Sequence, residues 1–362
     1  MIRSRQILWL QLCVSMFFSC RPGTGSAVQE EFSYYTNPIL QTSGPAFGAV
    51  FHDGLYYFIR SIDDRIWLWT TDDITEIASA KGRRIWPADD NNSYSHIWDP
   101  QIHNIDGKWY VYFSMDDGDQ DNRQLHVLEN PSPDPAEGEF VLKGKIVTDS
   151  QNNFAIYGHP FRHRGKLYLL WSAWKHKRIF EEIQCLYIAE MANPWSLASE
   201  RVMISEPKYE WECQWVGVDG NKSAYPVYVN EMPCVFHSRD NDKLLVYYAA
   251  SANWTPYHCV GLLVANADSD PLSPASWTKM VEPVFMQSPE NKVFAPSNVC
   301  FVPSPDMTEW YMLYLARNSS KDMLVVDKRS LRMQPVAWDD EGMPVLGIPV
   351  KEGEPLRKPS GL

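Results

Sequence analysis

Several features that would indicate a particular class of function or fold are missing from this 362-residue chain. Basic residues are in the minority, with 33 Lys and Arg against 45 Asp and Glu, so the formal net charge is −12. That balance argues against nucleic acid or an acidic membrane surface as the main partner. The chain has no Cys-x-x-Cys pair, which disfavours a zinc site. It also has no long apolar pattern with a period of 3.6 residues, so we expect little helix.

Long apolar runs are also missing, except for one at the N-terminus. Arg3 and Arg5 precede the apolar residues 7–18, and small residues follow up to Ala27. This order is typical of a secretory signal, and twelve apolar residues are too few to span a bilayer comfortably. We therefore expect residues 1–27 to be a signal peptide and the mature chain to be secreted and extracellular, with no membrane span. Lipidation at Cys20 is the alternative.

Sequons and cysteines follow in the mature part. Five cysteines remain there, so at least one thiol stays unpaired within a single chain. The others are either buried free thiols or form one or two disulfides.

The Asn-x-Ser/Thr sequons of the mature part would accept N-glycans in a eukaryotic secretory route. They lie at Asn91, Asn221, Asn253 and Asn318.

The chain is rich in aromatic residues, with 15 Trp, 18 Tyr and 15 Phe. Aromatic rings suit β-structure and also sites that stack on the flat faces of sugars. Many of them belong to a pattern that recurs five times, in which a turn with Gly or Asp is followed by alternating aromatic and aliphatic residues. Such a pattern predicts a hairpin leading into a half-buried strand. The five turns lie at Asp53-Gly54, Asp106-Gly107, Arg164-Gly165, Asp242 and Glu309.

Repeats of about fifty residues with several short strands each are typical of propeller blades. We therefore predict an all-β fold, a five-bladed β-propeller over residues 28–350. A β-sandwich is the alternative, although it gives no reason for five copies at this spacing. Residues 351–362 are rich in Lys, Glu, Pro and Gly and are expected to be a loosely packed tail.

Longer motifs resemble glycoside hydrolase family 43, in particular its secreted α-L-arabinofuranosidases. The resemblance runs from Asn37 to about Pro349, and it implies the propeller fold and a glycan ligand at one end of the central channel. The motifs are Trp98–His103, Asp106–Ser114, Val127–Ser132, Val229–Pro233, Asp270–Lys279, Glu282–Phe285, the Arg329–Gln334 segment and Trp338.

The resemblance also implies an inverting mechanism, in which an acid protonates the leaving oxygen and a base activates water on the opposite face of the sugar. It places the acid at Glu231. The base position falls on Ala46, and the aspartate that raises the pKa of the acid falls on Tyr157, so two of three carboxylates are substituted. Without that aspartate we expect the pKa of Glu231 to fall. Asp99 and His159 are candidates for a compensating base, although each also fits a structural role.

Other channel-end residues are expected to bind the ligand. Asn298 stands where the family has a histidine that is often tied to a central calcium, so we expect no cofactor and leave calcium open. The predicted binding residues are Trp98, Phe47, Asn298, Arg329 and Arg332.

Three functions remain open at this point. The chain is a glycosidase with impaired hydrolysis, a carbohydrate-binding pseudoenzyme, or a protein whose pocket has been re-purposed for a less polar, non-sugar ligand. The first two need an oligosaccharide or a small sugar as partner. The third follows because replacing aspartates by Ala46 and Tyr157 removes charge from the pocket.

Overall fold

The computed structural model describes residues 32–87, 94–321 and 328–362. Met1–Phe32 and Ser33–Leu362 form two separate units, and the description below concerns the second. The predicted signal peptide, residues 1–27, lies outside the described residues. Across the described ranges, no helix has the length and apolar character needed to cross a membrane. The short 3₁₀ helices are η1 (Ile74–Ser79), η2 (Gln120–Asn122), η3 (Glu210–Glu212) and η4 (Pro274–Ser276).

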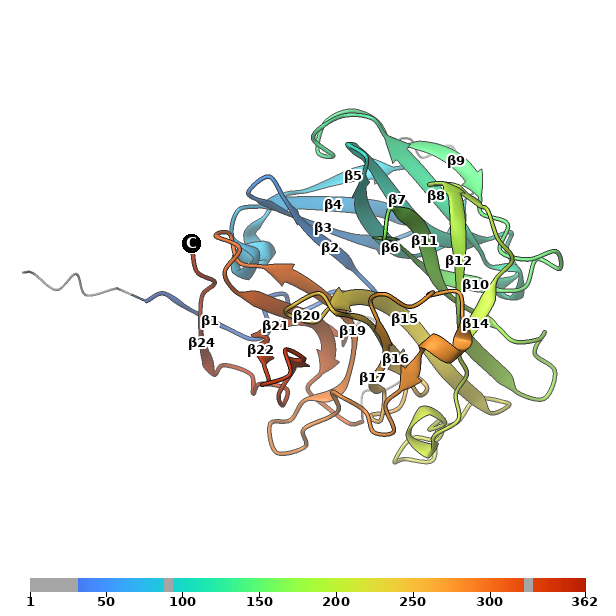
Figure 1. Ribbon diagram of the computed structural model, residues 1–362. Coiled ribbons are helices and arrows are strands. Elements are labelled where there is room, and N and C mark those ends of the chain that lie inside the picture. The colour runs from blue at the N-terminus through green and yellow to red at the C-terminus, as the bar shows by residue number, and fades with distance from the viewer. Residues whose placement is uncertain (1–31, 88–93, 322–327) are drawn as a thin grey trace, which may run out of the picture. The chain divides into compact units, whose positions relative to one another are not determined.

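The strands form five consecutive units that are antiparallel within themselves (Figure 1), and a short parallel pairing of β12 with β15 joins the third and fourth units into one sheet. The first unit contains β2 (Gly48–His52), β3 (Leu55–Ile62), β4 (Arg65–Thr71) and β5 (Gly82–Trp86). The second contains β6 (Ser95–Ile105), β7 (Lys108–Asp116), β8 (Gln124–Asn130) and β9 (Val141–Lys145). The third contains β10 (Ala155–His163), β11 (Lys166–Trp174), β12 (Glu182–Asn193), β13 (Ser196–Leu197) and β14 (Val202–Ser205). The fourth contains β15 (Val227–His237), β16 (Lys243–Ala250), β17 (Cys259–Asn266) and β18 (Thr278–Lys279). The fifth contains β19 (Phe294–Pro303), β20 (Trp310–Arg317) and β21 (Ser330–Pro335), with β22 (Ala337–Trp338) and β23 (Pro344–Val345) pairing beside it.

Three of the predicted turns connect the first two strands of a unit through only two residues. In Asp53-Gly54, Asp106-Gly107 and Arg164-Gly165, both residues have positive φ, between 49° and 81°. Positive φ at both central positions matches the right-handed twist of the flanking strands, and Gly adopts it without steric cost. These local signals therefore fix the start of units one, two and three.

The hydrophobic core is divided among the interfaces between neighbouring units. Five clusters of buried side chains join units one and two, two and three, three and four, four and five, and finally five and one. The first strands β2, β6, β10, β15 and β19 contact one another in the same cyclic order. This is the arrangement of propeller blades around a channel. The predicted fold class, an all-β propeller, is confirmed.

The C-terminal tail, residues 351–362, contains a short strand although most of its residues are exposed. Within it, β24 (Pro355–Arg357) pairs antiparallel with β1 (Tyr34–Thr36), and the two lie side by side in Figure 1. Lys358 adds ion pairs to Asp73 at 2.7 Å and Glu76 at 3.0 Å. This pairing could not be predicted from the composition of the tail, because the partner strand lies more than 300 residues earlier in the chain.

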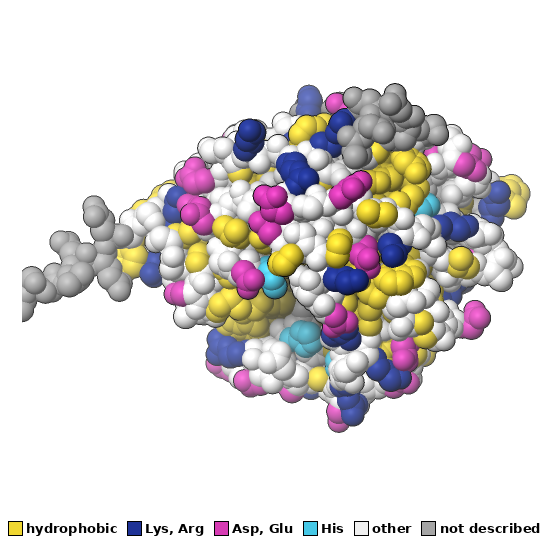
Figure 2. Space-filling view, turned by 90° about the horizontal axis from the view of Figure 1, so that it is seen from above, with side chains coloured by type: hydrophobic (Ala, Val, Ile, Leu, Met, Phe, Trp, Pro, Cys, Tyr) yellow, Lys and Arg dark blue, Asp and Glu magenta, His cyan; other side chains and the backbone are white. Residues whose placement is uncertain are grey.

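Charged side chains of both signs are interspersed over the face that Figure 2 shows. The five cysteines from Cys185 to Cys300 are all free thiols. The alternative of one or two disulfides within the mature chain therefore does not apply to this structure.

Candidate functional site

Bulges in the first strands shape the end of the channel. The register of β6, β10, β15 and β19 shifts there, and one residue of β10 and β15 and two residues of β6 and β19 take a positive φ of 50–56°. A bulge re-aims the neighbouring side chains and breaks the pleat. The positive-φ residues are His96, Asp99, Tyr157, Met232, Ala295 and Asn298. Because Met232 is turned in this way, its neighbour Glu231 faces the channel end.

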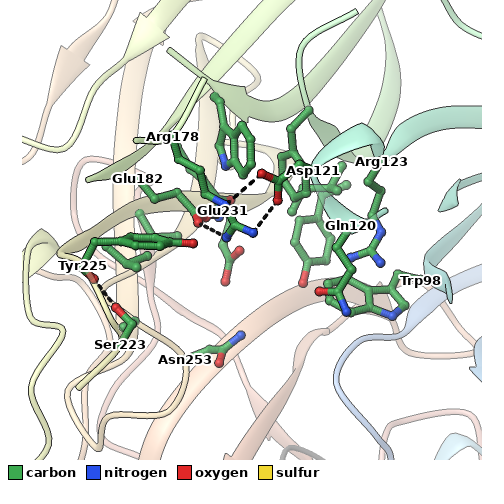
Figure 3. Close-up of a pocket in the computed structure, with 18 of the residues that line it drawn as sticks. Trp98, Gln120, Asp121, Arg123, Arg178, Glu182, Ser223, Tyr225, Glu231 and Asn253 are labelled. Carbon is green, nitrogen blue, oxygen red and sulfur yellow. Dashed lines mark hydrogen bonds and ion pairs between the residues drawn. The ribbon is translucent and has the colours of Figure 1, made fainter. Parts of the chain in front are cut away.

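A pocket of about 240 Å³ opens there, with Glu231 in its lining. Its walls carry Phe154 and Trp174, whose rings stack with centroids 4.6 Å apart, and also Trp98. In Figure 3, Glu231 points into the space between Tyr225 on one side and Trp98 with Gln120 on the other. We call this cavity the hub pocket.

Glu231 is held in the acid form. The residue is 5% exposed, and burial raises the pKa of its carboxyl to about 8. The nearby Arg329 opposes that rise in pKa, whereas the charges of Glu182 and Asp99 add to it. A carboxyl with this pKa carries its proton at neutral pH and can donate it to a leaving oxygen. The expectation that the absence of an aspartate at position 157 lowers this pKa relative to other members of the family stays a prediction.

His258 lies beside Glu231, a neighbour that the sequence reading missed. Its Nε2 atom is 3.8 Å from Oε1 of Glu231, and its Nδ1 atom is 2.8 Å from the carbonyl oxygen of Ser251. A carbonyl only accepts, so Nδ1 carries the proton and Nε2 of the neutral ring is unprotonated. Burial, followed by the charge of Arg329, lowers the pKa of His258 to about 3.

Ala46 and Tyr157 belong to one apolar cluster, which we call the floor; Tyr157 lines the hub pocket together with Glu231, whereas Ala46 is not part of that lining. Ala46 is 3% exposed and packs in one cluster with Tyr157, Met232, Trp174 and other apolar residues. Burial raises the pKa of the Tyr157 hydroxyl well above its usual value, and the nearby Glu231 adds to that rise. Neither residue can therefore take up a proton from water at neutral pH.

Asp99 lies beneath this floor and does not line the hub pocket. It is 1% exposed, and its carboxylate accepts hydrogen bonds from the Ser114 hydroxyl and from the Tyr157 backbone N–H. Burial raises the pKa of Asp99 to about 6, although these hydrogen bonds oppose the rise. Its role here is to hold the strained backbone of Tyr157 in place.

His159, the second candidate base, lines a separate small cavity deeper in the channel, together with Phe47 and Asn298. Burial lowers the pKa of His159 to about 4, and its Nε2 atom accepts from the Val235 N–H at 3.4 Å. Asn298 donates to the carbonyl oxygen of Phe47 at 3.1 Å. The structure therefore places neither candidate base beside Glu231.

The side chains of that deeper cavity do not fit calcium. They offer imidazoles, thiols and amides, whereas calcium prefers several carboxylate and carbonyl oxygens. Across the described residues, no group of three or more His, Cys, Asp or Glu side chains is placed to hold a metal ion. The absence of a cofactor stays a prediction.

Of the two predicted binding arginines, Arg329 is close to the hub pocket and Arg332 is not. Arg329 is fully buried behind Glu231 and donates to the carbonyl oxygens of Pro45 and Asn253. Arg332 donates to Ser330, to the carbonyl oxygen of Val350 and to Asn318, far from the lining of the pocket. Both hold backbone segments together.

A group of ion-paired side chains on the pocket wall was not predicted from the sequence. Arg178 lies in the segment between β11 and β12, where it pairs with Asp121 and, at 3.0 Å, with Glu182 (Figure 3). The Trp174 and Tyr225 rings lie 5.0 and 5.3 Å from its guanidinium. Parallel pairing of β12 with β15 brings Glu182 to this wall, and no repeat motif predicts that pairing.

Trp98 lines the pocket as expected and is 37% exposed. The guanidinium of Arg123 lies over its ring, 3.4 Å from the centroid. Arg123 is itself 2.5 Å from Asp116, and both side chains are buried. A buried ion pair thus fixes the tryptophan at the mouth of the pocket.

Comparison with known proteins agrees with this architecture. The sequence profile of glycosyl hydrolases family 43 matches residues 35–344. The chain belongs to glycosyl hydrolases family 43. The extracellular exo-α-(1→5)-L-arabinofuranosidase of Streptomyces chartreusis is 32% identical over 321 residues, which cover 87% of this chain and 92% of that protein. The enzyme of the same name from Streptomyces avermitilis is 34% identical over 88% of this chain and 64% of its own length.

A solved relative supports the same placement in family 43. The crystal structure of an α-L-arabinofuranosidase from Lactobacillus brevis superposes with a TM-score of 0.77 at 31% identity, covering 88% of this chain and 98% of that one. The names of the two Streptomyces relatives also agree with the predicted secretion of this family 43 chain.

The predicted glycan acceptors of this family 43 chain have different surroundings. Asn91 lies outside the described residues. Asn221 bonds Asp219, and Asn318 contacts Arg332 and Glu352. Asn253 lines the hub pocket, so a glycan on it would occupy the pocket. Glycosylation at all four positions stays a prediction.

Proposed function

We propose that the hub pocket binds the terminal sugar of an arabinose-containing glycan and that inverting hydrolysis there is impaired. The chain keeps the scaffold of its arabinofuranosidase relatives, with the acid position occupied by Glu231. It is proposed to act as a glycan-binding protein, secreted like the Streptomyces relatives.

The composition of the pocket supports a sugar ligand. Trp98 and Tyr225 provide partly exposed rings that stack on the C–H faces of sugars, and the buried Trp174 supports the pocket wall. Asn253 and Gln120 provide neutral groups that hydrogen-bond hydroxyls. A volume of about 240 Å³ suits one sugar ring rather than a long segment.

One observation supports the impaired hydrolysis: the positions that the family resemblance assigns to the two aspartates hold Ala46 and Tyr157, which pack in one apolar cluster. An inverting enzyme needs a base roughly 6.5–9.5 Å from its acid, with room for a water between them. Asp99 and His159 do not line the pocket, so neither restores that base. Losing a general base costs about 10²–10⁴-fold in rate.

The test combines turnover and binding. The purified chain is incubated with an aryl α-L-arabinofuranoside and with arabino-oligosaccharides, and binding of the same oligosaccharides is measured by calorimetry. We expect binding with little or no turnover, and weaker binding by Trp174→Ala, with Tyr257→Ala as an aromatic control outside the pocket. Absence of sugar binding would contradict the proposal and favour a less polar ligand.

Retained hydrolysis through Glu182 is a second candidate, because Glu182 lines the same pocket. The parallel register places Glu182 opposite Val227, four residues before Glu231 and so about 13 Å along the strand direction. Side chains that extend toward each other shorten this offset toward the separation of an inverting pair. Against it, Arg178 and Gln184 already bond the Glu182 carboxylate.

Substitution separates the two candidates. If Glu182 is the base, turnover is measurable in the wild-type chain and is lost in both Glu182→Gln and Glu231→Gln. If the pocket only binds, wild-type turnover is absent at high protein concentration and Glu182→Gln changes affinity alone. Asp121→Asn, which alters the same ion-paired group, is the matched control.

A further inference from the structure

A second hollow lies at the opposite end of β15 from the hub pocket. It has a volume of about 680 Å³ and is lined by the ends of β15, β19 and β20 and by β22. Glu231 and His237 are six residues apart on β15, which corresponds to about 20 Å along the strand. The deeper channel cavity with Pro233 and Cys234 lies between them. We call this second hollow the aromatic groove.

Aromatic rings form one side of the groove. Phe236 stacks on Phe301 with centroids 4.3 Å apart and on Trp338 at 5.9 Å, and Trp310 meets it edge-on at 4.9 Å. Phe236 is buried, whereas Phe301, Trp310 and Trp338 are each partly exposed. The buried Phe236 ring therefore supports the other three rings. Their exposed parts form a rigid apolar surface, which we call the platform.

Polar groups on the same hollow suit a neutral, hydroxyl-rich ligand. The guanidinium of Arg239 lies 5.4 Å from the Trp338 centroid, and Asn241 lines the hollow beside it. His237 also lines it, and burial lowers the pKa of that histidine. Among the described residues of the lining there is no carboxylate, so the groove has hydrogen-bonding groups but no acid and base pair.

We propose that the aromatic groove is a second glycan-binding site, which holds a segment of a neutral polysaccharide without cleaving it. Stacked aromatic rings with a few polar groups at their edge are suited to sugar rings, whose faces are apolar and whose rims carry hydroxyls. The volume is nearly three times that of the hub pocket and accommodates more than one ring. This inference does not depend on the proposed function of the hub pocket.

The test counts sites with linear arabino-oligosaccharides by calorimetry. Trp338→Ala removes one face of the platform, and Arg239→Gln removes the charged donor while leaving the ring packing intact. Asn253→Ala alters the hub pocket alone, and Tyr257→Ala is a control in neither site. We expect two sites in the wild type, one in Trp338→Ala, one in Asn253→Ala, and about tenfold weaker groove binding in Arg239→Gln.

The outcomes separate the two sites. One wild-type site that Trp338→Ala loses and Asn253→Ala keeps supports the groove and contradicts hub-pocket binding. One site that only Asn253→Ala loses overturns the groove, as does unchanged two-site binding in Trp338→Ala and Arg239→Gln. Binding of polygalacturonate but not of neutral oligosaccharides would also overturn it. If Trp338→Ala does not fold, Arg239→Gln decides.

Discussion

The Nε2 atom of His258 and the Oε1 atom of Glu231 lie 3.8 Å apart and both side chains are buried, yet they do not form an ion pair at neutral pH. Burial lowers the pKa of His258 to about 3 and raises that of Glu231 to about 8, so both groups are uncharged. An unprotonated nitrogen beside the carboxyl favours its acid form. The carboxyl at the acid position of this family 43 site therefore carries its proton at neutral pH.

Glu231 makes the stability of the fold depend on pH. Its pKa is about 8 in the folded chain and 4.5 without the fold, so the unfolded state loses the proton first as the pH rises. The free energy of unfolding therefore falls between about pH 4.5 and 8, and levels off above pH 8. Glu231→Gln removes this effect. We expect its melting temperature to exceed that of the wild type increasingly from pH 4 to 8.

Thermal melts of both proteins across this range check the prediction. Glu290→Gln, which removes an exposed carboxyl group, is the control for a change in net charge. A difference between Glu231→Gln and the wild type that stays constant from pH 4 to 9 would contradict the raised pKa.

Restoring the two family carboxylates tests whether only the chemistry was lost. Tyr157 has a φ of 56°, a conformation that Asp adopts more readily than Tyr, so Tyr157→Asp fits the local backbone. Ala46→Asp supplies a base beside Glu231. We expect the double variant to hydrolyse an aryl α-L-arabinofuranoside at least 10²-fold faster than the wild type.

The control for that gain is the triple variant with Glu231→Gln, which should lose the new activity. The single variants separate the two carboxylates, because a base without its partner gives only part of the rate. No turnover in a folded double variant would mean that the cavity itself has been reshaped.

The features that could be predicted from the sequence are those that a few neighbouring residues encode. The turns at Asp53-Gly54 and Asp106-Gly107 were predicted because two residues suffice to set a hairpin. Glu231 was singled out because the short motif around it, Val229–Pro233, resembles that of family 43. Glu182 was missed because its position depends on parallel pairing with β15, a contact between two units that no short motif encodes.

The position of Asp99 could not be predicted for a related reason. Asp99 carries the right chemistry beside Trp98, but adjacent residues of a strand point to opposite sides, and the bulge turns Asp99 beneath Tyr157. The sequence also gives no measure of burial, and it is burial that sets the pKa of Glu231.

The ion pair between Arg123 and Asp116 supports the Trp98 ring, and both side chains of the pair are buried. Arg123→Gln leaves the Asp116 carboxylate with His96 at 2.7 Å and the Gly118 N–H as its remaining partners. Removing one member of a buried pair costs about 3 kcal/mol of unfolding free energy. Arg162→Gln is the matched control, since Arg162 and Asp106 are exposed and such a pair contributes about 0–1 kcal/mol. Urea denaturation measures both, and equal small losses would contradict a structural role for Arg123.

The C-terminal segment should contribute to the stability of the whole ring. Besides the pairing of β24 with β1, Lys358 reaches Asp73 in unit one, and the Ser360 N–H donates to Glu309 in unit five at 3.1 Å. The segment thus ties the first and last units together at the point where the ring closes. We expect deletion of residues 353–362 to lower the urea midpoint by an amount equal to about 2 kcal/mol or more, since several partly buried hydrogen bonds are lost at once. Deletion of Leu362 alone is the control. An unchanged midpoint after the longer deletion would show that the ring closes through the cluster between units five and one without this strand.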